Sequence, residues 1–211
     1  METSIAARTV RTTETGKAIY ERRAVRKYKN TPVDRKLIEQ VLDAGRMAPS
    51  AMNKQPWHFY VLTGKDTIQA FSREIAAIAM KGALSSGISG IKQVIKAAAG
   101  LLHFVHGINL HALKDPVFYE APVVIFLTAS RDNEWAPLDI GMCAQNIMLA
   151  ARSVGLDSCP VGFGKFVVKT KIYSRLHVPD SEEVHLAIIL GYGDESPKAH
   201  ERARDNVLFI D

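Results

Sequence analysis

Arginines near the start of the chain have the types and the spacing of an anion-binding segment. Arg22, Arg23 and Arg26 follow one another closely, and Arg22 and Arg26 lie on the same side of the chain whether it is helical or extended. A guanidinium is planar and always charged, so it can grip a phosphate or a carbonyl oxygen through paired hydrogen bonds. Taken alone, the cluster also fits an ordinary solvated basic surface.

A second basic cluster lies near the C-terminal end, at Lys198, Arg202 and Arg204, in a chain of 211 residues with a formal net charge of +5. Two separated clusters suit a phosphate held from two sides better than a continuous stripe for nucleic acid. The aromatic residues lie in apolar segments rather than between Lys and Arg, which argues against a nucleic-acid-binding protein.

Two loops have the composition of a site for a heterocyclic ring. The segment 49–57 reads PSAMNKQPW, and its Ser, Asn and Gln side chains offer donors and acceptors to a ring edge. The segment 159–164 reads CPVGFG, and glycine would let backbone N–H groups approach a ligand closely. Each loop could equally be a plain connection. Because no His or Asp can be placed beside Cys159, a nucleophilic thiol is not expected there.

The elements that must position these loops are mixed helices and strands without a regular βαβ repeat. Apolar residues at helical spacing, with Thr15 and Asp34 as N-caps and Gly45 as a stop, predict the helices 15–22, 34–45, 67–80, 137–154 and 169–176. Apolar and β-branched runs predict the strands 57–63, 122–129 and 184–190, whereas 82–90 reads as a Gly/Ser-rich break and 158–164 as a loop. The result is one α+β domain with a small sheet between helical layers.

The apolar segment 94–113 approaches the ~20 residues that cross a bilayer. Lys96 and the histidines His103, His106 and His111 make it a poor spanning helix. On a helix His111 is rotated by roughly 80° from the other two, so a metal site is not expected either. We expect a helix that covers an apolar site or packs at a subunit interface.

The number and spacing of the cysteines indicate where in the cell the protein is expected. Cys143 and Cys159 are the only cysteines and form no CxxC pair, and the first residues hold no apolar run of signal-peptide length. A reducing cytoplasm is the expected location.

The order and spacing of these motifs together resemble the nitroreductase family, from about Gly16 to the C-terminus. The matching strings are Arg22-Arg23-x-x-Arg26-x-Tyr28, Ala48-Pro49-Ser50-x-x-Asn53-x-Gln55-Pro56-Trp57-x-Phe59, Gly155-Leu156-x-Ser158-Cys159-Pro160 and Leu190-Gly191-Tyr192. The resemblance leaves 1–15 as a flexible N-terminal segment and 16–211 as a single FMN-binding domain. It implies a three-layer sandwich with a small, mostly antiparallel sheet flanked by helices, an intertwined homodimer, and 91–113 as a variable helical cover.

The resemblance also implies an FMN-dependent oxidoreductase. In a ping-pong cycle, hydride would pass from NAD(P)H through flavin N5 to a nitroaromatic, a quinone or an activated alkene. Alternatives are a flavin-fragmenting or reductive dehalogenating relative, and a flavin-binding module without turnover.

The implied FMN-binding residues come from four segments of the chain, 22–26, 49–55, 159–162 and 202–204. Arg22 would meet the phosphate and Arg26 the pyrimidine edge of the ring. Pro49, Ser50 and Ala51 would come from the other subunit, with Asn53 and Gln55 in support. The full set is Arg22, Arg23, Ala24, Arg26, Pro49, Ser50, Ala51, Asn53, Gln55, Cys159, Pro160, Val161, Gly162, Arg202 and Arg204. Two departures from the family pattern are Ala24 in place of a frequent Ser, and a single glycine, Gly162, where many members have a Gly-Gly or Glu-Gly pair.

Overall fold

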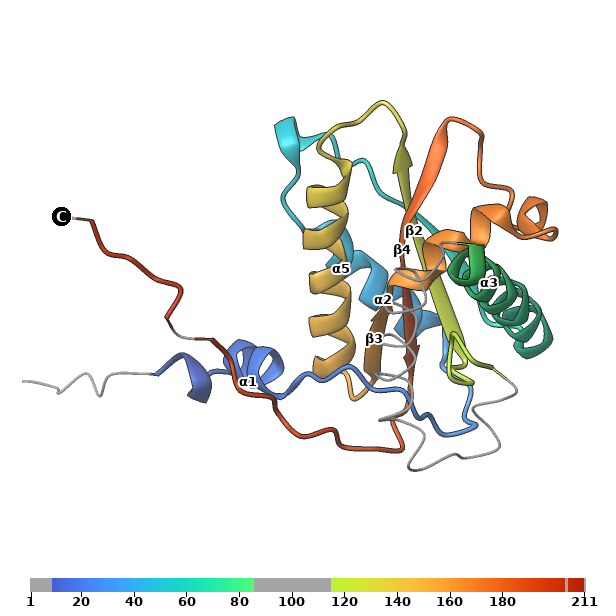
Figure 1. The fold of residues 1–211 in the computed structure, drawn as a ribbon. Helices are drawn as coiled ribbons and strands as arrows, with labels where there is room; N and C mark the ends of the chain where they lie inside the picture. Colours follow the sequence, from blue (N-terminus) through green and yellow to red (C-terminus); the bar gives the residue numbers. More distant parts are fainter. Residues whose placement is uncertain (1–8, 86–114, 204, 211) are drawn as a thin grey trace, which may run out of the picture.

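The computed structural model of the chain describes residues 9–85, 115–203 and 205–210. A four-stranded sheet lies between two helical layers (Figure 1). One layer is α2 (Arg35–Arg46) with α5 (Ala136–Ser153), and the other is α3 (Lys65–Ser85) with the 3₁₀ segments η4 (Gly162–Lys169) and η5 (Tyr173–Leu176). The expected α+β three-layer sandwich is confirmed.

The sheet has the order β1-β2-β4-β3, and all neighbouring strands are antiparallel. The strands are β1 (His58–Leu62), β2 (Val123–Ser130), β3 (Asp157–Val161) and β4 (Glu182–Gly191). Every residue of β2 except Ser130 is buried, because helical layers cover both faces of this central strand. That double burial explains the continuous apolar run from which the strand was predicted.

Two expectations for the second half of the chain are wrong. The segment 158–164 is not a loop: Asp157–Val161 pairs with β4 as an edge strand. Proline lacks an N–H group, and an edge strand tolerates it, so Pro160 does not prevent pairing. The single helix expected over 169–176 is replaced by η4 and η5.

Two helices also begin or end at residues other than those the sequence pattern predicts. Thr13, not Thr15, caps α1 (Glu14–Glu21), since its Oγ1 accepts from the Gly16 N–H at 3.0 Å. The short segment η1 (Val10–Thr12) precedes it. Helix α3 continues through the expected break at Gly82 to Ser85. Asp34 caps α2 as predicted, accepting from the Lys36 N–H at 2.8 Å.

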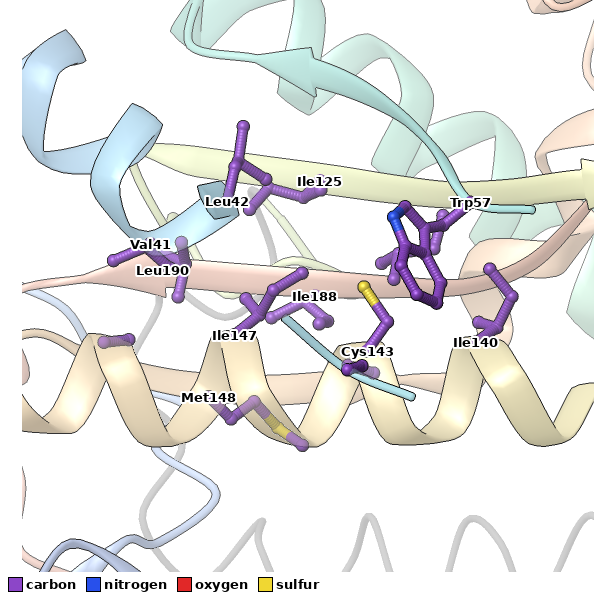
Figure 2. Close-up of a cluster of buried hydrophobic side chains, with 14 of the residues drawn as sticks. Val41, Leu42, Trp57, Ile125, Ile140, Cys143, Ile147, Met148, Ile188 and Leu190 are labelled. Carbon is purple, nitrogen blue, oxygen red and sulfur yellow. The ribbon is translucent and has the colours of Figure 1, made fainter. Parts of the chain in front are cut away.

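Gly45 does not end α2 but lets it approach α5. A Cβ at Gly45 would lie 2.6 Å from Cγ1 of Ile147, so no larger residue fits without displacing α5. Figure 2 shows the resulting contact layer, in which Ile147 and Cys143 of α5 face Trp57 and the sheet. Close packing of α2, α5 and the sheet therefore fixes both ends of α5, where the candidate site residues lie.

The C-terminal segment leaves the body of the domain and runs away from the sheet (Figure 1). Val207, Leu208, Phe209 and Ile210 are 66% to 87% exposed. No helix among the described residues is long and apolar enough to cross a membrane. The segment 91–113, expected to be a helical cover, lies outside the described residues.

Candidate functional site

The arginine segment that follows α1 is fixed against the edge of the sheet. Ala24 forms a parallel bridge with Ser158 of β3, and the Val25 N–H donates to the Ser158 carbonyl at 3.1 Å. Further along, Tyr28 bridges Gly193, just after β4. The backbone of 22–28 is therefore extended and held beside the sheet, with the arginines next to the first residues of the CPVGFG string.

Arg22 is a half-buried cation, and one of its guanidinium nitrogens lacks a hydrogen-bond partner in the described part of the chain. Its Nη1 atom and the hydroxyl of Ser158 are both inaccessible and have no hydrogen-bond partner among the residues the structure describes. Burial lowers the pKa of Arg22, and the nearby guanidinium groups of Arg23 and Arg202 lower it further, although the Cys159 thiol opposes them. Burying an unpaired charge among like charges is unfavourable, and a phosphate at this point would remove the penalty.

Of the C-terminal basic residues, Arg202 lies near enough to Arg22 for its positive charge to lower the pKa of Arg22. Arg23 has a local task, because its Nη1 donates to the carbonyls of Tyr20 and Arg22, each at 2.7 Å. Arg204 lies outside the described residues, and Lys198 is exposed.

Arg26 is placed by several neighbours. Its Nη1 lies 3.4 Å from the Ala24 carbonyl, and its backbone N–H donates to Oε1 of Glu195 at 2.5 Å. Burial raises the pKa of Tyr119, and a hydrogen bond with Arg26 opposes that shift. Neither Glu195 nor Tyr119 was predicted as a site residue. No sequence motif marks Tyr119 as a site residue. Its left-handed backbone (φ 56°) and its hydrogen bond with Arg26 arise from the fold.

Cys159 is a buried thiol rather than a nucleophile. Its exposed fraction is 1%, and burial raises its pKa, although Arg26 and Arg22 act in the opposite direction. The following residues are more open: Pro160 and Gly162 are exposed, and no atom lies within 4 Å of a Cβ built on Gly162. Val161 between them is buried. The edge of β3 thus offers accessible backbone beside the arginines, where a flat ring could lie.

The predicted loop 49–55 has a constrained backbone. Met52, Asn53 and Gln55 have φ angles of 52°, 54° and 47°, a region that costs energy for residues other than glycine. The Gln55 N–H donates to Ser50 Oγ at 2.9 Å, and Gln55 Nε2 donates to Asn53 Oδ1 at 3.2 Å. Within this loop lies the short segment η2 (Ala51–Asn53), and Pro49, Asn53 and Gln55 are exposed.

A single chain does not bring this loop to the arginines. The loop contacts the first turn of α5, where the Ala51 N–H donates to Asp139 at 3.1 Å. The arginine segment lies at the other end of the same helix, where Arg152 pairs with Glu21 at 3.3 Å and with Asp157 at 3.4 Å. Helix α5 has 18 residues and is therefore about 27 Å long. Figure 1 shows the two groups at opposite ends of α5.

A partly open cavity of the domain lies elsewhere. Its volume is about 260 Å³, and it lies near the ends of β1 and β2, lined among others by Lys29, Thr63, Lys65, Asp115 and Glu120. None of the expected FMN-binding residues lines it. Within the described ranges, no group of His, Cys, Asp and Glu side chains could hold a metal ion. His103, His106 and His111 lie outside those ranges.

Comparison with known proteins gives a consistent result. The family model described as "Nitroreductase family" matches residues 19–192. The chain is 34% identical to a 4-nitrobenzoate reductase of Pseudomonas putida, over 84% of this chain and 85% of the relative. It is 28% identical to a chloronitrobenzene nitroreductase of Comamonas testosteroni, over 90% and 91%. The fold resembles a crystal structure of a nitroreductase with bound FMN from Desulfitobacterium hafniense DCB-2, with a TM-score of 0.74, 23% identity and coverage of 94% and 99%.

Proposed function

The chain belongs to the nitroreductase family, and on that premise we propose that it is an NAD(P)H-dependent FMN oxidoreductase that reduces nitroaromatic compounds. The observation that carries the proposal is the half-buried Arg22, whose Nη1 atom is buried and unpaired among the described residues, near the exposed Pro160 and Gly162 at the end of β3. A relative named 4-nitrobenzoate reductase and structural neighbours with bound FMN support the substrate class and the cofactor.

The residues around the β3 edge fit a flavin mononucleotide. Arg22 and Arg202 would hold the phosphate, because Arg202 lies near enough to lower the pKa of Arg22 and a phosphate would interact favourably with both charges. Arg26 would hold the pyrimidine edge of the ring, and the backbone of 160–162 would lie along one ring face. When bound, FMN accepts a hydride from NAD(P)H and delivers it to the second substrate.

The chain supplies charge and shielding for this chemistry. The backbone of Arg26 is held by Glu195, and its guanidinium lies 3.4 Å from the Ala24 carbonyl, so its charge would be in place before the flavin is reduced. A positive charge at the pyrimidine edge stabilises the negative charge of a reduced flavin without rearrangement. The end of β3 would cover one face of the bound ring, so both substrates would use the other face in turn. We therefore propose ping-pong order, with no protein acid or base.

We propose that two copies build each site. The loop 49–55 and the arginine segment lie at opposite ends of α5, so antiparallel copies would place the loop of one against the arginines of the other. The exposed apolar side chains of Leu138 (56%) and of 207–210 offer surface for such an intertwined homodimer. Cys143 and Cys159 are free and buried, in line with the reducing cytoplasm that we propose as the location.

The proposal is tested by an absorption spectrum of the purified protein. We expect a yellow protein that bleaches with NADPH or NADH under anaerobic conditions and regains its colour when 4-nitrobenzoate is added. Initial rates at several concentrations of both substrates should give parallel double-reciprocal lines. A colourless protein that takes up no added FMN, or a bound flavin that neither nucleotide reduces, contradicts the proposal, and converging lines contradict the order.

A further inference from the structure

Asp139 is a buried carboxylate with no task in the chemistry proposed above. It lies in the first turn of α5 and is 1% exposed. Its Oδ1 accepts from the Ala51 N–H at 3.1 Å, whereas its Oδ2 is buried and has no hydrogen-bond partner in the described part of the chain. Only one of the two carboxylate oxygens therefore accepts a hydrogen bond within the described residues.

The stability of the fold does not account for an acid at this position. Asp139 stands on the buried face of α5 beside Ile140 and Cys143, which pack in the core. Leaving a buried acceptor unpaired costs free energy, and the N-terminal end of the helix dipole offsets only part of that cost. An apolar side chain would pack there without this penalty, and the bond from the Ala51 N–H is the one hydrogen bond of this carboxylate within the described residues.

That contact ties a strained loop to a rigid helix. The hydrogen bonds of Ser50, Asn53 and Gln55 join the loop to itself and do not set its place on the domain. The bond from Ala51 to Asp139 does so, in the middle of the loop and just before the left-handed residues Met52 and Asn53.

We propose that Asp139 is a positioning residue of the flavin site, which holds the Ser50-Ala51 backbone at the place from which this loop reaches the flavin of the second copy. The inference rests on the proposed function. It assigns to α5 a second role: its C-terminal end supports the arginine segment of its own chain, and its N-terminal end sets the loop offered to the partner.

The test compares Asp139→Ala with Asp139→Asn. Asparagine keeps an acceptor for the Ala51 N–H and removes the charge, while alanine removes both. We expect the FMN dissociation constant, measured by fluorescence titration of flavin-free protein, to rise about tenfold in Asp139→Ala and to stay within about threefold in Asp139→Asn. In flavin-free protein, backbone amides of 49–55 should exchange faster in Asp139→Ala only. The matched control is Glu134→Gln, which removes an exposed carboxylate from the same end of α5.

A second variant removes the donor instead of the acceptor. Ala51 is the first residue of η2, and Ser50 before it is extended (φ −142°, ψ 154°), so the backbone accommodates Ala51→Pro. This variant should match Asp139→Ala, and it keeps the proposal testable if Asp139→Ala does not fold.

Three results would overturn the positioning role: unchanged amide exchange of 49–55 in Asp139→Ala, equal losses of FMN affinity in both Asp139 variants, or an equal loss in Glu134→Gln. If the wild-type protein binds no FMN, the proposed function fails, whereas the exchange comparison still decides whether Asp139 holds the loop.

Discussion

Arg22 gives the sharpest prediction, because two opposite effects follow from one change. Replacing Arg22 with methionine keeps much of the apolar stem and removes the guanidinium. The buried Nη1 atom has no hydrogen-bond partner in the described residues. The positive charges of Arg23 and Arg202 lower the pKa of Arg22. Removing that charge should leave the flavin-free protein as stable as the wild type or slightly more so, because a half-buried cation with an unpaired nitrogen disappears.

The effect on FMN binding has the other sign. A hydrogen bond between charged partners contributes about 1.5–3 kcal/mol. Because every 1.4 kcal/mol is a factor of ten in affinity, the dissociation constant of FMN should rise about 10-fold to 100-fold. Riboflavin has the same ring and no phosphate, so its affinity should change by less than about threefold if Arg22 meets the phosphate.

The assay is a fluorescence titration of flavin-free protein with FMN and with riboflavin, in parallel with thermal unfolding. Arg35→Met is the matched control, because Arg35 is an exposed arginine on α2 that pairs with Glu39. Equal losses for FMN and riboflavin would refute the phosphate contact. A large drop in the melting temperature of the flavin-free variant would refute the claim that Arg22 is an unpaired cation.

Three further predictions concern packing, titration and assembly. Gly45→Ala should lower the free energy of unfolding by about 1 kcal/mol or more in urea titrations, because the new Cβ would lie 2.6 Å from Ile147; an unchanged midpoint would contradict the close approach of α2 and α5. Burial raises the pKa of the Cys143 thiol to about 12, so the unfolded chain loses this proton first and stability should fall as pH rises from about 8.5 towards 12. Cys143→Ala should fall less steeply over the same range, and equal slopes would refute this role. Deleting residues 207–210 should weaken the dimer at least tenfold in sedimentation experiments, since these apolar side chains are exposed in the single chain.

The helices and strands that were predicted correctly are those indicated by residues close together in the sequence. The apolar run of β2, the buried stripe of α5 and the Asp34 cap each follow from neighbours along the chain, and each is confirmed. Strand β3 was missed because Pro160 and Gly162 read locally as a turn. Its pairing with β4 is a tertiary effect that overrides those signals.

In the candidate site, too, some residues could be predicted from the sequence and others only from the fold. The arginine segment and the basic tail could be selected by residue type, and the structure places Arg202 near Arg22. The sequence holds a weak sign of Asp139, since an acid four residues before Cys143 falls on the buried stripe of its helix. Its partner, the Ala51 N–H, lies on a loop far away in the sequence, and only the fold reveals that contact.

The central claim is that opposite ends of two copies form each flavin site, and hybrid dimers test it most directly. One chain carries Arg22→Met, and the other has glycine at positions 49, 50 and 51. In a hybrid, one site combines both defects and the other combines the intact arginines with the intact loop. We predict one tightly bound FMN per hybrid dimer, at wild-type affinity, although neither homodimer binds FMN tightly. Two equally weak sites in the hybrid would show that each chain builds its own site and would contradict the account.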